Sequence, residues 1–382
     1  MTMSSSWSLA YDTWDGKEQE AMKEVIDSGR FTAGPKVLEF EKAFAKKMRV
    51  PYAVMVNSGG SANLLMVALA VETGRLERGN KIIVPAVGWS TSYFPFIQYG
   101  IDLVFVDVDK QTWNIDVEQV RKAAEYDPDI TAVLAINLLG NPCDFTSLRG
   151  VCDDLALLLF EDNCESLGAS YSGDYCGTLG DLGTFSTFFS HHIQTMEGGI
   201  VVCQNKREYN LLLSLRSHGW TRGTSFDTGN PFEFITKGYN VRPGELNGAI
   251  GLEQLKKHDA MLSKRKQNGV DFVSHFGSAE YGSIQKTLPV ARSSWFGFGI
   301  VFNTLALKNK ATKILDEEGV EYRPICTGNF TRQPVMGLVN EISGTLEQAN
   351  KLHDNGIFLG NSPVDLSKEI ERIGYRFKKE LT

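Results

Sequence analysis

The sequence predicts an α/β protein built on a mainly parallel β-sheet that helices cover on both faces. Short apolar runs rich in β-branched residues recur between longer helical patterns. They are YAVMV, KIIVPA, DLVFVDV, TAVLAIN, LALLLFED, GTFSTF and GIVVC. These runs are continuously apolar rather than alternating, which is typical of strands that are buried on both faces.

The elements of the first half follow one another as strand and helix. The first run, at residues 52–56, leads into a helical pattern at 61–74 that small polar residues open. The fifth run ends in Asp162, after four consecutive apolar residues, and is expected to be a central strand. The sixth run leads into the histidine-containing stretch FSTFFSHHIQTMEGG at 185–199.

The second half repeats the alternation on a smaller scale. A helical stretch at 244–267 precedes the apolar run WFGFGIVF, a helix near 308–318, the segment VEYRPI and a final amphipathic pattern. We therefore predict a large domain at residues 1–255, which includes the N-terminal segment, and a smaller C-terminal α/β domain at 256–382.

Composition excludes several classes of protein. With 382 residues, 42% of them hydrophobic, the chain can bury a substantial core. A net charge of -7 without a run of basic residues disfavours nucleic acid as a partner. No stretch approaches the roughly 20 apolar residues of a membrane span, and no basic region followed by an apolar segment marks a leader, so we expect a cytoplasmic protein that does not bind a membrane. The six cysteines are scattered, without a CxxC pair, and are expected to be reduced.

Ligands of such sheets bind at the carboxyl ends of the strands, so polar residues at those ends are candidates for a site. The segment NSGGSAN at 57–63 places small residues at a helix start, where free N–H groups and the helix dipole favour an anion such as phosphate. Asp162 is a carboxylate at the end of a buried strand and needs a partner. An arginine or a protonated pyridine nitrogen would serve equally well.

The adjacent residues His191 and His192 are candidates for a metal site, a general base or packing. Neighbouring residues at an extended strand end point to opposite sides, and no carboxylate or cysteine cluster accompanies them. We therefore expect no bound metal.

Six motifs in order resemble the sugar aminotransferase family of fold-type I pyridoxal-phosphate enzymes across nearly the whole chain. They are NSGGSAN, PAVGWST, FEDNCESLG, FSTFFSHHIQTMEGG, HGWTRG and GYNVRPGELNGAIGLEQL. The resemblance implies an aspartate-aminotransferase-like large domain that holds the cofactor. In that family a lysine precedes the EGG motif and forms a Schiff base with the cofactor. Here His191 occupies the lysine position, and no lysine occurs between Lys122 and Lys206.

Histidine at this position resembles the sugar 3-dehydratase branch of the family. The resemblance implies that pyridoxamine phosphate, formed from pyridoxal phosphate with glutamate as amino donor, serves to remove the 3-hydroxyl of a 4-keto-6-deoxy sugar linked to a nucleotide, by similarity GDP. The products are ammonia and a 4-keto-3,6-dideoxy sugar. The iron-sulfur branch needs closely spaced cysteines that are absent here, so no such cluster is expected. The alternatives are a nucleotide-sugar 4-aminotransferase with an unusual base, and an inactive relative that binds cofactor or sugar.

The resemblance also implies residue roles. The catalytic base is His191, and the cofactor-binding residues are Gly60, Ser61, Trp89, Asp162, Glu165, Ser186 and Asn240. Asp162 bonds the pyridine nitrogen, Trp89 stacks on the ring, and Glu165 lies near the ring hydroxyl. The phosphate is bound by Gly60, Ser61 and Ser186, and by Asn240 from a second subunit, which implies a homodimer with shared sites. Gly60 stands where the branch has serine, so backbone amides are expected to do more of the phosphate binding.

Four side chains in these motifs could have a purely structural role instead. Trp89 would often belong to a core, and Glu165 would often pair with an arginine. His192 is expected to be a packing or hydrogen-bonding neighbour because the motif spacing selects His191, and His218 is an additional candidate for a structural role.

Overall fold

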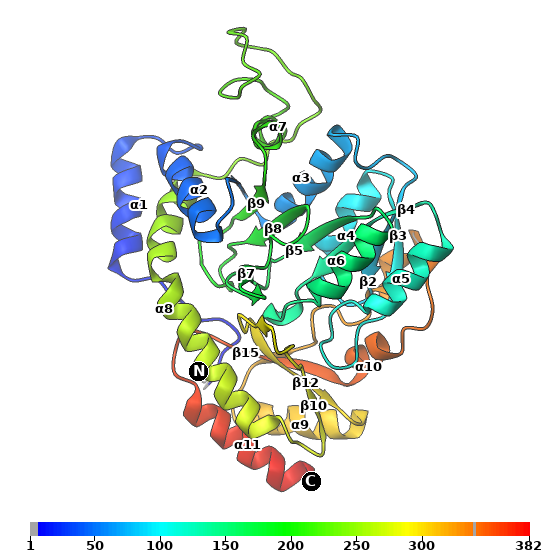
Figure 1. Ribbon diagram of the computed structural model, residues 1–382. Coiled ribbons are helices and arrows are strands. Elements are labelled where there is room, and N and C mark those ends of the chain that lie inside the picture. Colours follow the sequence, from blue (N-terminus) through cyan, green and yellow to red (C-terminus); the bar gives the residue numbers. More distant parts are fainter. Residues whose placement is uncertain (1–6, 339–340) are drawn as a thin grey trace.

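The centre of the fold is an eight-stranded, mainly parallel sheet (Figure 1). The structure is a computed structural model that describes residues 7–338 and 341–382. Met1–Ser6, part of the segment inspected for a leader, lie outside the described residues. The strand order is β1 (Tyr52–Val56), β9 (Gly199–Cys203), β8 (Leu182–Ser186), β5 (Leu158–Asp162), β4 (Ile130–Ile136), β2 (Lys81–Pro85), β3 (Asp102–Val106) and β14 (Glu341–Ile342). Among the described strands of this sheet, β9 alone runs in the direction opposite to the others. The predicted parallel sheet is confirmed.

Helices cover both faces of this sheet, as the continuous apolar runs predict. One face packs against α3 (Gly59–Glu72), α4 (Ser90–Gln98) and α7 (Lys206–Arg216). The other packs against α5 (Val117–Tyr126) and α6 (Phe145–Asp154) on one side, and against α2 (Pro35–Met48) and α8 (Glu245–Phe276) on the other. Within β1, Val54 and Val56 face the first cluster, whereas Ala53 and Met55 face α2, because successive strand residues point to opposite faces.

A second sheet has the order β10 (Gly282–Ile284), β12 (Gly297–Phe302), β15 (Gly356–Gly360) and β13 (Tyr322–Arg323), and all its pairings are antiparallel. Its core includes residues from α9 (Leu305–Glu317), α11 (Ser367–Leu381) and the C-terminal half of α8. Trp7 packs into the same core and donates from Nε1 to the Gly360 carbonyl at 2.7 Å. The N-terminal segment therefore lies against the smaller sheet. The two-sheet α/β architecture expected for fold type I is confirmed.

The remaining elements join these layers. They are α1 (Gly16–Ser28), α10 (Glu347–Asn355), the 3-10 turns at Leu138–Gly140, Phe330–Arg332 and Pro334–Leu338, and a small sheet of β11 (Ala291–Arg292), β6 (Ser170–Tyr171) and β7 (Asp174–Tyr175). In the described part of the chain, no helix is long and apolar enough to cross a membrane.

Helix α8 runs along both sheets and links them (Figure 1). Gly248 and Gly251 let its first half approach Val37 and Phe40 of α2, where a Cβ atom would lie within 3 Å of its neighbours. Near its end, His275 faces Gly374 of α11. The predicted boundary between residues 255 and 256 falls inside this helix, and the division into two domains stays a prediction.

Candidate active site

All of the predicted site residues except Asn240 belong to segments at one edge of the large sheet. Parallel strands end at the same edge, and the segments that leave it carry the polar side chains. Asp162 ends β5, Ser186 ends β8, Ser61 lies in the first turn of α3 after β1, and Trp89 lies between β2 and α4. The loop from Thr187 to Gly198 follows β8 and carries His191.

Asp162 is a buried carboxylate, 5% exposed, that neutral donors alone surround. Its Oδ2 accepts from Ser92 Oγ at 2.6 Å and from Asn63 Nδ2 at 2.8 Å, and its Oδ1 accepts from the Cys164 N–H at 3.0 Å. No cationic side chain within the described residues forms an ion pair with it. The alternative of an arginine partner is wrong, and the charge remains available to a cationic ligand.

Trp89 is the residue before the first turn of α4 and is 56% exposed. Its core alternative is therefore wrong. Three residues later in the chain, Ser92 donates to Asp162, so Trp89 lies within one helical turn of a residue that contacts the buried carboxylate. An exposed indole is a suitable platform for a planar ring.

The start of α3 forms a cradle with small side chains and free donors. Ser58 caps the helix, since its Oγ accepts from the Ser61 N–H at 3.1 Å. The first N–H groups, those of Gly59 and Gly60, have no partner inside the helix. A Cβ on Gly59 would lie 2.7 Å from the Ser186 Cβ, so glycine lets the end of β8 approach the helix start. This arrangement fits an anion.

Glu165 takes its two hydrogen bonds from residues with left-handed backbones. Its Oε2 accepts from the Leu139 N–H at 2.7 Å, and its Oε1 accepts from the Cys326 thiol at 3.2 Å. Leu139 has a φ of 52° and Cys326 a φ of 48°. Such strain in non-glycine residues collects at functional sites. Burial raises the pKa of Glu165, and these partners replace the arginine of the structural alternative.

His191 is half-buried and stands between two aromatic rings. Its ring lies edge-on to Phe296 at a centroid distance of 5.2 Å and to Phe188 at 5.8 Å. Its polar side-chain neighbour is Ser190, whose Oγ lies 3.4 Å from Nδ1. Burial, and after it the charge of Arg265, lowers the pKa of His191 to about 3. The imidazole is therefore neutral near pH 7 and can accept a proton.

The backbone of this loop is fixed at its base. The Thr195 N–H donates to the Thr187 carbonyl at 2.9 Å, and the two hydroxyls of these residues lie 2.5 Å apart. From α8, Asn247 Nδ2 donates to the carbonyls of Thr195 and Glu197 at 2.7 and 2.9 Å. His191 thus stands on a loop that contacts across its own base and a residue of α8 hold in place.

His192 has a different environment from its neighbour. It is 3% exposed, and its Nε2 lies 3.1 Å from the Ser294 carbonyl. Burial and nearby cationic groups hold its pKa well below the usual value. Its burial and this contact fit the predicted packing and hydrogen-bonding role, which stays a prediction. In the described ranges 7–338 and 341–382, no three His, Cys, Asp or Glu side chains are arranged to hold a metal ion.

Asn240 stands apart from the other candidates. Its side chain is exposed, and among the described residues no hydrogen bond joins it to another predicted site residue. Its neighbour Val241 accepts from the Asn57 N–H at 3.0 Å, next to the start of α3. His218 is also exposed and has a φ of 65°, and its N–H donates to the Tyr239 carbonyl at 2.7 Å.

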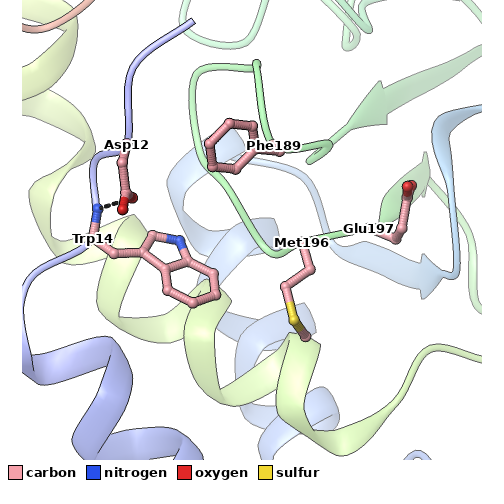
Figure 2. Close-up of a pocket in the computed structure, with 5 residues that line it drawn as sticks. All are labelled: Asp12, Trp14, Phe189, Met196 and Glu197. Atoms are coloured by element: carbon pink, nitrogen blue, oxygen red, sulfur yellow. Dashed lines mark hydrogen bonds between the residues drawn. The ribbon is translucent and has the colours of Figure 1, made fainter. Parts of the chain in front are cut away.

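The His191 loop also lines a small groove of about 380 Å³. Figure 2 shows Phe189, Met196 and Glu197 of this loop opposite Asp12 and Trp14 of the N-terminal segment. None of these side chains is among the predicted site residues.

A model of the DegT/DnrJ/EryC1/StrS aminotransferase family matches residues 12–377. The chain belongs to this family. The GDP-4-keto-6-deoxy-D-mannose 3-dehydratase of Yersinia pseudotuberculosis is 43% identical over 388 residues, which cover 97% of this chain and 98% of the relative. A crystal structure of a GDP-4-keto-6-deoxymannose-3-dehydratase with a trapped PLP-glutamate geminal diamine has a TM-score of 0.92 at 40% identity and covers 97% of this chain and 99% of the other. A histidine-to-asparagine mutant of that enzyme with bound GDP-perosamine matches equally well. The resemblance to the family and to its 3-dehydratase branch is confirmed.

The site of this family member fits a pyridine cofactor. Asp162 offers a buried negative charge without a cation, the start of α3 offers free N–H groups, and Trp89 offers an open ring face. The sequence reasoning did not identify the residues that surround Asp162, Glu165 and His191. They are Asn63, Ser92, Leu139, Cys326, Phe296 and Arg265. Asn63 had a signal, because an amide inside an otherwise apolar helical run needs a buried partner.

Proposed function

We propose that this protein removes the 3-hydroxyl of a GDP-linked 4-keto-6-deoxy sugar, GDP-4-keto-6-deoxy-D-mannose, with pyridoxamine phosphate as cofactor and glutamate as amino donor. The observation that carries this proposal is His191, which stands where the family's lysine bonds the cofactor, in a chain that is 43% identical to a 3-dehydratase over nearly its full length. Histidine cannot form a Schiff base, but it can move a proton. When bound, the cofactor supplies an amine for the 4-keto group and a conjugated ring that accepts electrons.

The residues of the site then have defined tasks. Asp162 would bind the protonated pyridine nitrogen, and Trp89 would stack on the ring. Gly60, Ser61 and Ser186 would bind the phosphate, with the N–H groups at the start of α3 as the main donors. Glu165 would orient the ring through its hydroxyl.

His191 would perform two proton transfers. Its neutral imidazole would accept the proton that the 4' carbon of the cofactor gives up. The resulting imidazolium would give this proton to the departing 3-hydroxyl, which leaves as water. One side chain can serve as both base and acid because the same proton is taken and returned.

The active unit in this proposal is a homodimer with composite sites. Two features support it. The Asn240 side chain is exposed, and the preceding segment presents two exposed phenylalanine rings, Phe232 and Phe234, which stack with the half-buried Trp220 at centroid distances of 6.2 and 6.3 Å. This segment projects from the body of the molecule beyond α7 (Figure 1). Exposed apolar clusters commonly mark an interaction surface.

Incubation with pyridoxal phosphate, glutamate and GDP-4-keto-6-deoxy-D-mannose tests the activity. We expect release of ammonia together with 2-oxoglutarate and a 3-deoxy sugar. A stable 4-amino sugar would instead identify an aminotransferase, and no product of either kind would identify an inactive relative. Parallel assays with CDP, dTDP and UDP sugars test the choice of GDP.

Complementation tests the shared site. An Asn240→Ala chain and a His191→Asn chain should each be nearly inactive alone. A mixture should recover part of the activity because one of the two sites in a hybrid dimer keeps both residues. Inactive mixtures of two folded variants that exchange subunits would contradict the composite site.

A further inference from the structure

The N-terminal segment at residues 7–14 runs from the smaller sheet to the loop that carries His191. The start of this segment is anchored, because Trp7 is buried in the core of the smaller sheet and donates from Nε1 to the Gly360 carbonyl at 2.7 Å. The end of the segment leads into α1, whose first turn Asp15 caps. Since both ends are anchored, the middle of the segment provides a fixed support for the groups that it contacts.

The segment and the loop meet at Gln194, whose side chain is 1% exposed. Its Oε1 accepts from the Thr13 N–H at 3.1 Å, and its Nε2 donates to the Tyr11 carbonyl at 2.7 Å. The backbone carbonyl of Gln194 accepts from Trp14 Nε1 at 2.9 Å. Three hydrogen bonds from one residue to one short segment fix both the position and the orientation of that residue.

A buried glutamine of α8 joins the same network. Gln254 Oε1 accepts from the Gln194 N–H at 3.1 Å and from the Thr13 hydroxyl at 2.9 Å. Its Nε2 donates to Glu18 Oε1 at 2.8 Å. Buried polar networks whose members all have partners make a structure rigid. The loop is therefore held at Gln194 by the N-terminal segment and by α8 together.

The backbone between Gln194 and His191 is short and buried. The two residues between them, His192 and Ile193, are 3% and 0% exposed. Close-packed side chains transmit strain because they leave little free space. A shift of Gln194 is therefore passed on to His191 instead of being absorbed on the way.

Resting on the proposed function, we propose that Gln194 is a positioning residue, which ties the His191 loop to the N-terminal segment and so holds the imidazole in place for proton transfer. A lysine that bonds the cofactor is held partly by that bond. His191 forms no such bond, so its place relative to the cofactor depends on the loop that carries it. A misplacement of about 1 Å can cost a reaction about 100-fold in rate.

Steady-state kinetics of the full-length enzyme test this role. Gln194→Met keeps the length of the side chain and leaves the Thr13 N–H and the Tyr11 carbonyl without their partner. We expect kcat to fall about 10-fold to 100-fold. The KM for the sugar and the dissociation constant of pyridoxamine phosphate should stay close to the wild-type values, because Gln194 contacts none of the predicted cofactor-binding residues.

Trp14→Phe tests the same joint from its other side, and it decides the question if Gln194→Met does not fold. The variant keeps an aromatic ring and removes one donor to the Gln194 carbonyl. Loss of one hydrogen bond should lower kcat about 2-fold to 10-fold.

Gln119→Met is the matched control. Gln119 of α5 is a half-buried glutamine whose Oε1 accepts from the Asp107 N–H at 3.0 Å and whose Nε2 donates to Asp116 Oδ2 at 3.5 Å. The control makes the same chemical change and also leaves a backbone N–H without its partner, but it does so outside the His191 loop. Its kcat should equal that of the wild type.

Amide hydrogen exchange in the cofactor-free protein provides a readout that needs no turnover. Gln194→Met and Trp14→Phe should both speed exchange of the amides at residues 187–198, because local opening of the loop becomes easier. Exchange in β4 and β5 should not change in either variant. Gln119→Met should leave exchange of the loop at the wild-type rate.

Three results would overturn the proposal. The first is a folded Gln194→Met or Trp14→Phe with wild-type kcat and wild-type exchange of the loop. The second is a loss of activity that appears in KM or in cofactor affinity while kcat is unchanged. The third is an equal fall of kcat in Gln119→Met. If the wild type itself does not dehydrate the sugar, the proposed function is contradicted, and hydrogen exchange alone decides whether Gln194 holds the loop.

Discussion

Replacing Asp162 by asparagine separates its charge from its shape. In the present structure the carboxylate accepts from Ser92, Asn63 and the Cys164 N–H, at 2.6, 2.8 and 3.0 Å. These neutral donors orient the group but do not neutralise it. The variant keeps the size of the side chain and removes the charge that would meet a protonated pyridine nitrogen.

The expected loss follows from the strength of a charged hydrogen bond, which is worth about 1.5–3 kcal/mol. At about 1.4 kcal/mol for each tenfold change, pyridoxamine phosphate should bind Asp162→Asn about 10-fold to 100-fold more weakly. In the cofactor-free protein, the substitution removes a buried charge that lacks a cationic partner in the described residues, which is stabilising. It also sets the new amide against the Asn63 amide, which is destabilising. These effects oppose each other, so the stability of the free protein should change by about 1 kcal/mol at most.

Titration of the protein with pyridoxamine phosphate, followed by tryptophan fluorescence, gives the dissociation constant, and thermal unfolding with and without cofactor gives the linked stabilisation. Ser92→Ala is the matched control, because it removes one hydrogen bond from the same oxygen but leaves the charge. It should weaken binding by about tenfold or less. Wild-type affinity in a folded Asp162→Asn would refute the assignment of Asp162 to the pyridine nitrogen.

Three further predictions address other parts of the structure. Cys326→Ala removes a hydrogen-bond donor to Glu165 and should lower kcat/KM by the equivalent of about 0.5–1.5 kcal/mol. Cys326→Ser keeps a donor and should retain most of the activity. Equal rates for the two variants would contradict a role for this hydrogen bond. Arg216→Met leaves the buried Glu41 without its partner at 2.6 Å and should cost about 3–5 kcal/mol in urea unfolding, part of which Glu41→Gln added to it should restore. Burial raises the pKa of Glu161 from 4.5 to about 7, so the folded state binds the proton of this carboxyl more tightly than the unfolded state does. The protonated carboxyl therefore contributes its full stabilisation below pH 4.5. This contribution is lost as the pH rises through about 7. The difference in stability between wild type and Glu161→Gln should therefore shift against the wild type across that interval, and a constant difference would show that Glu161 titrates normally.

Local patterns in the sequence were sufficient to predict most of the fold. Each apolar run of the first half became a strand of the large sheet, because length and β-branched composition distinguish buried strands from helices. Asp162 could be placed at the end of a strand for the same reason. The antiparallel order of the smaller sheet and the packing of Trp7 against it were not predicted, since both depend on contacts between segments far apart in the chain.

The supporting residues of the site show the same limit more clearly. Glu165 and its donor Cys326 are 161 positions apart, and Asp162 and its donor Asn63 are 99 apart. The left-handed backbone of Cys326 has no signal in composition, because tertiary contacts rather than its own preference impose it. Motifs could therefore predict which groups touch the cofactor, but they carried no signal for the residues that orient those groups.

The absence of a Schiff-base lysine changes which contacts must retain the cofactor. In a lysine enzyme the covalent bond holds the aldehyde form even when one other contact is lost. Here His191 cannot form that bond, so retention would depend on the sum of noncovalent contacts in both forms of the cofactor. Among the candidates, Asp162 is the buried carboxylate that no described cationic side chain neutralises, whereas Ser186, Trp89 and the start of α3 contribute neutral contacts. Loss of the Asp162 charge should accordingly appear first as loss of cofactor on dialysis, before any effect on the proton transfers of His191.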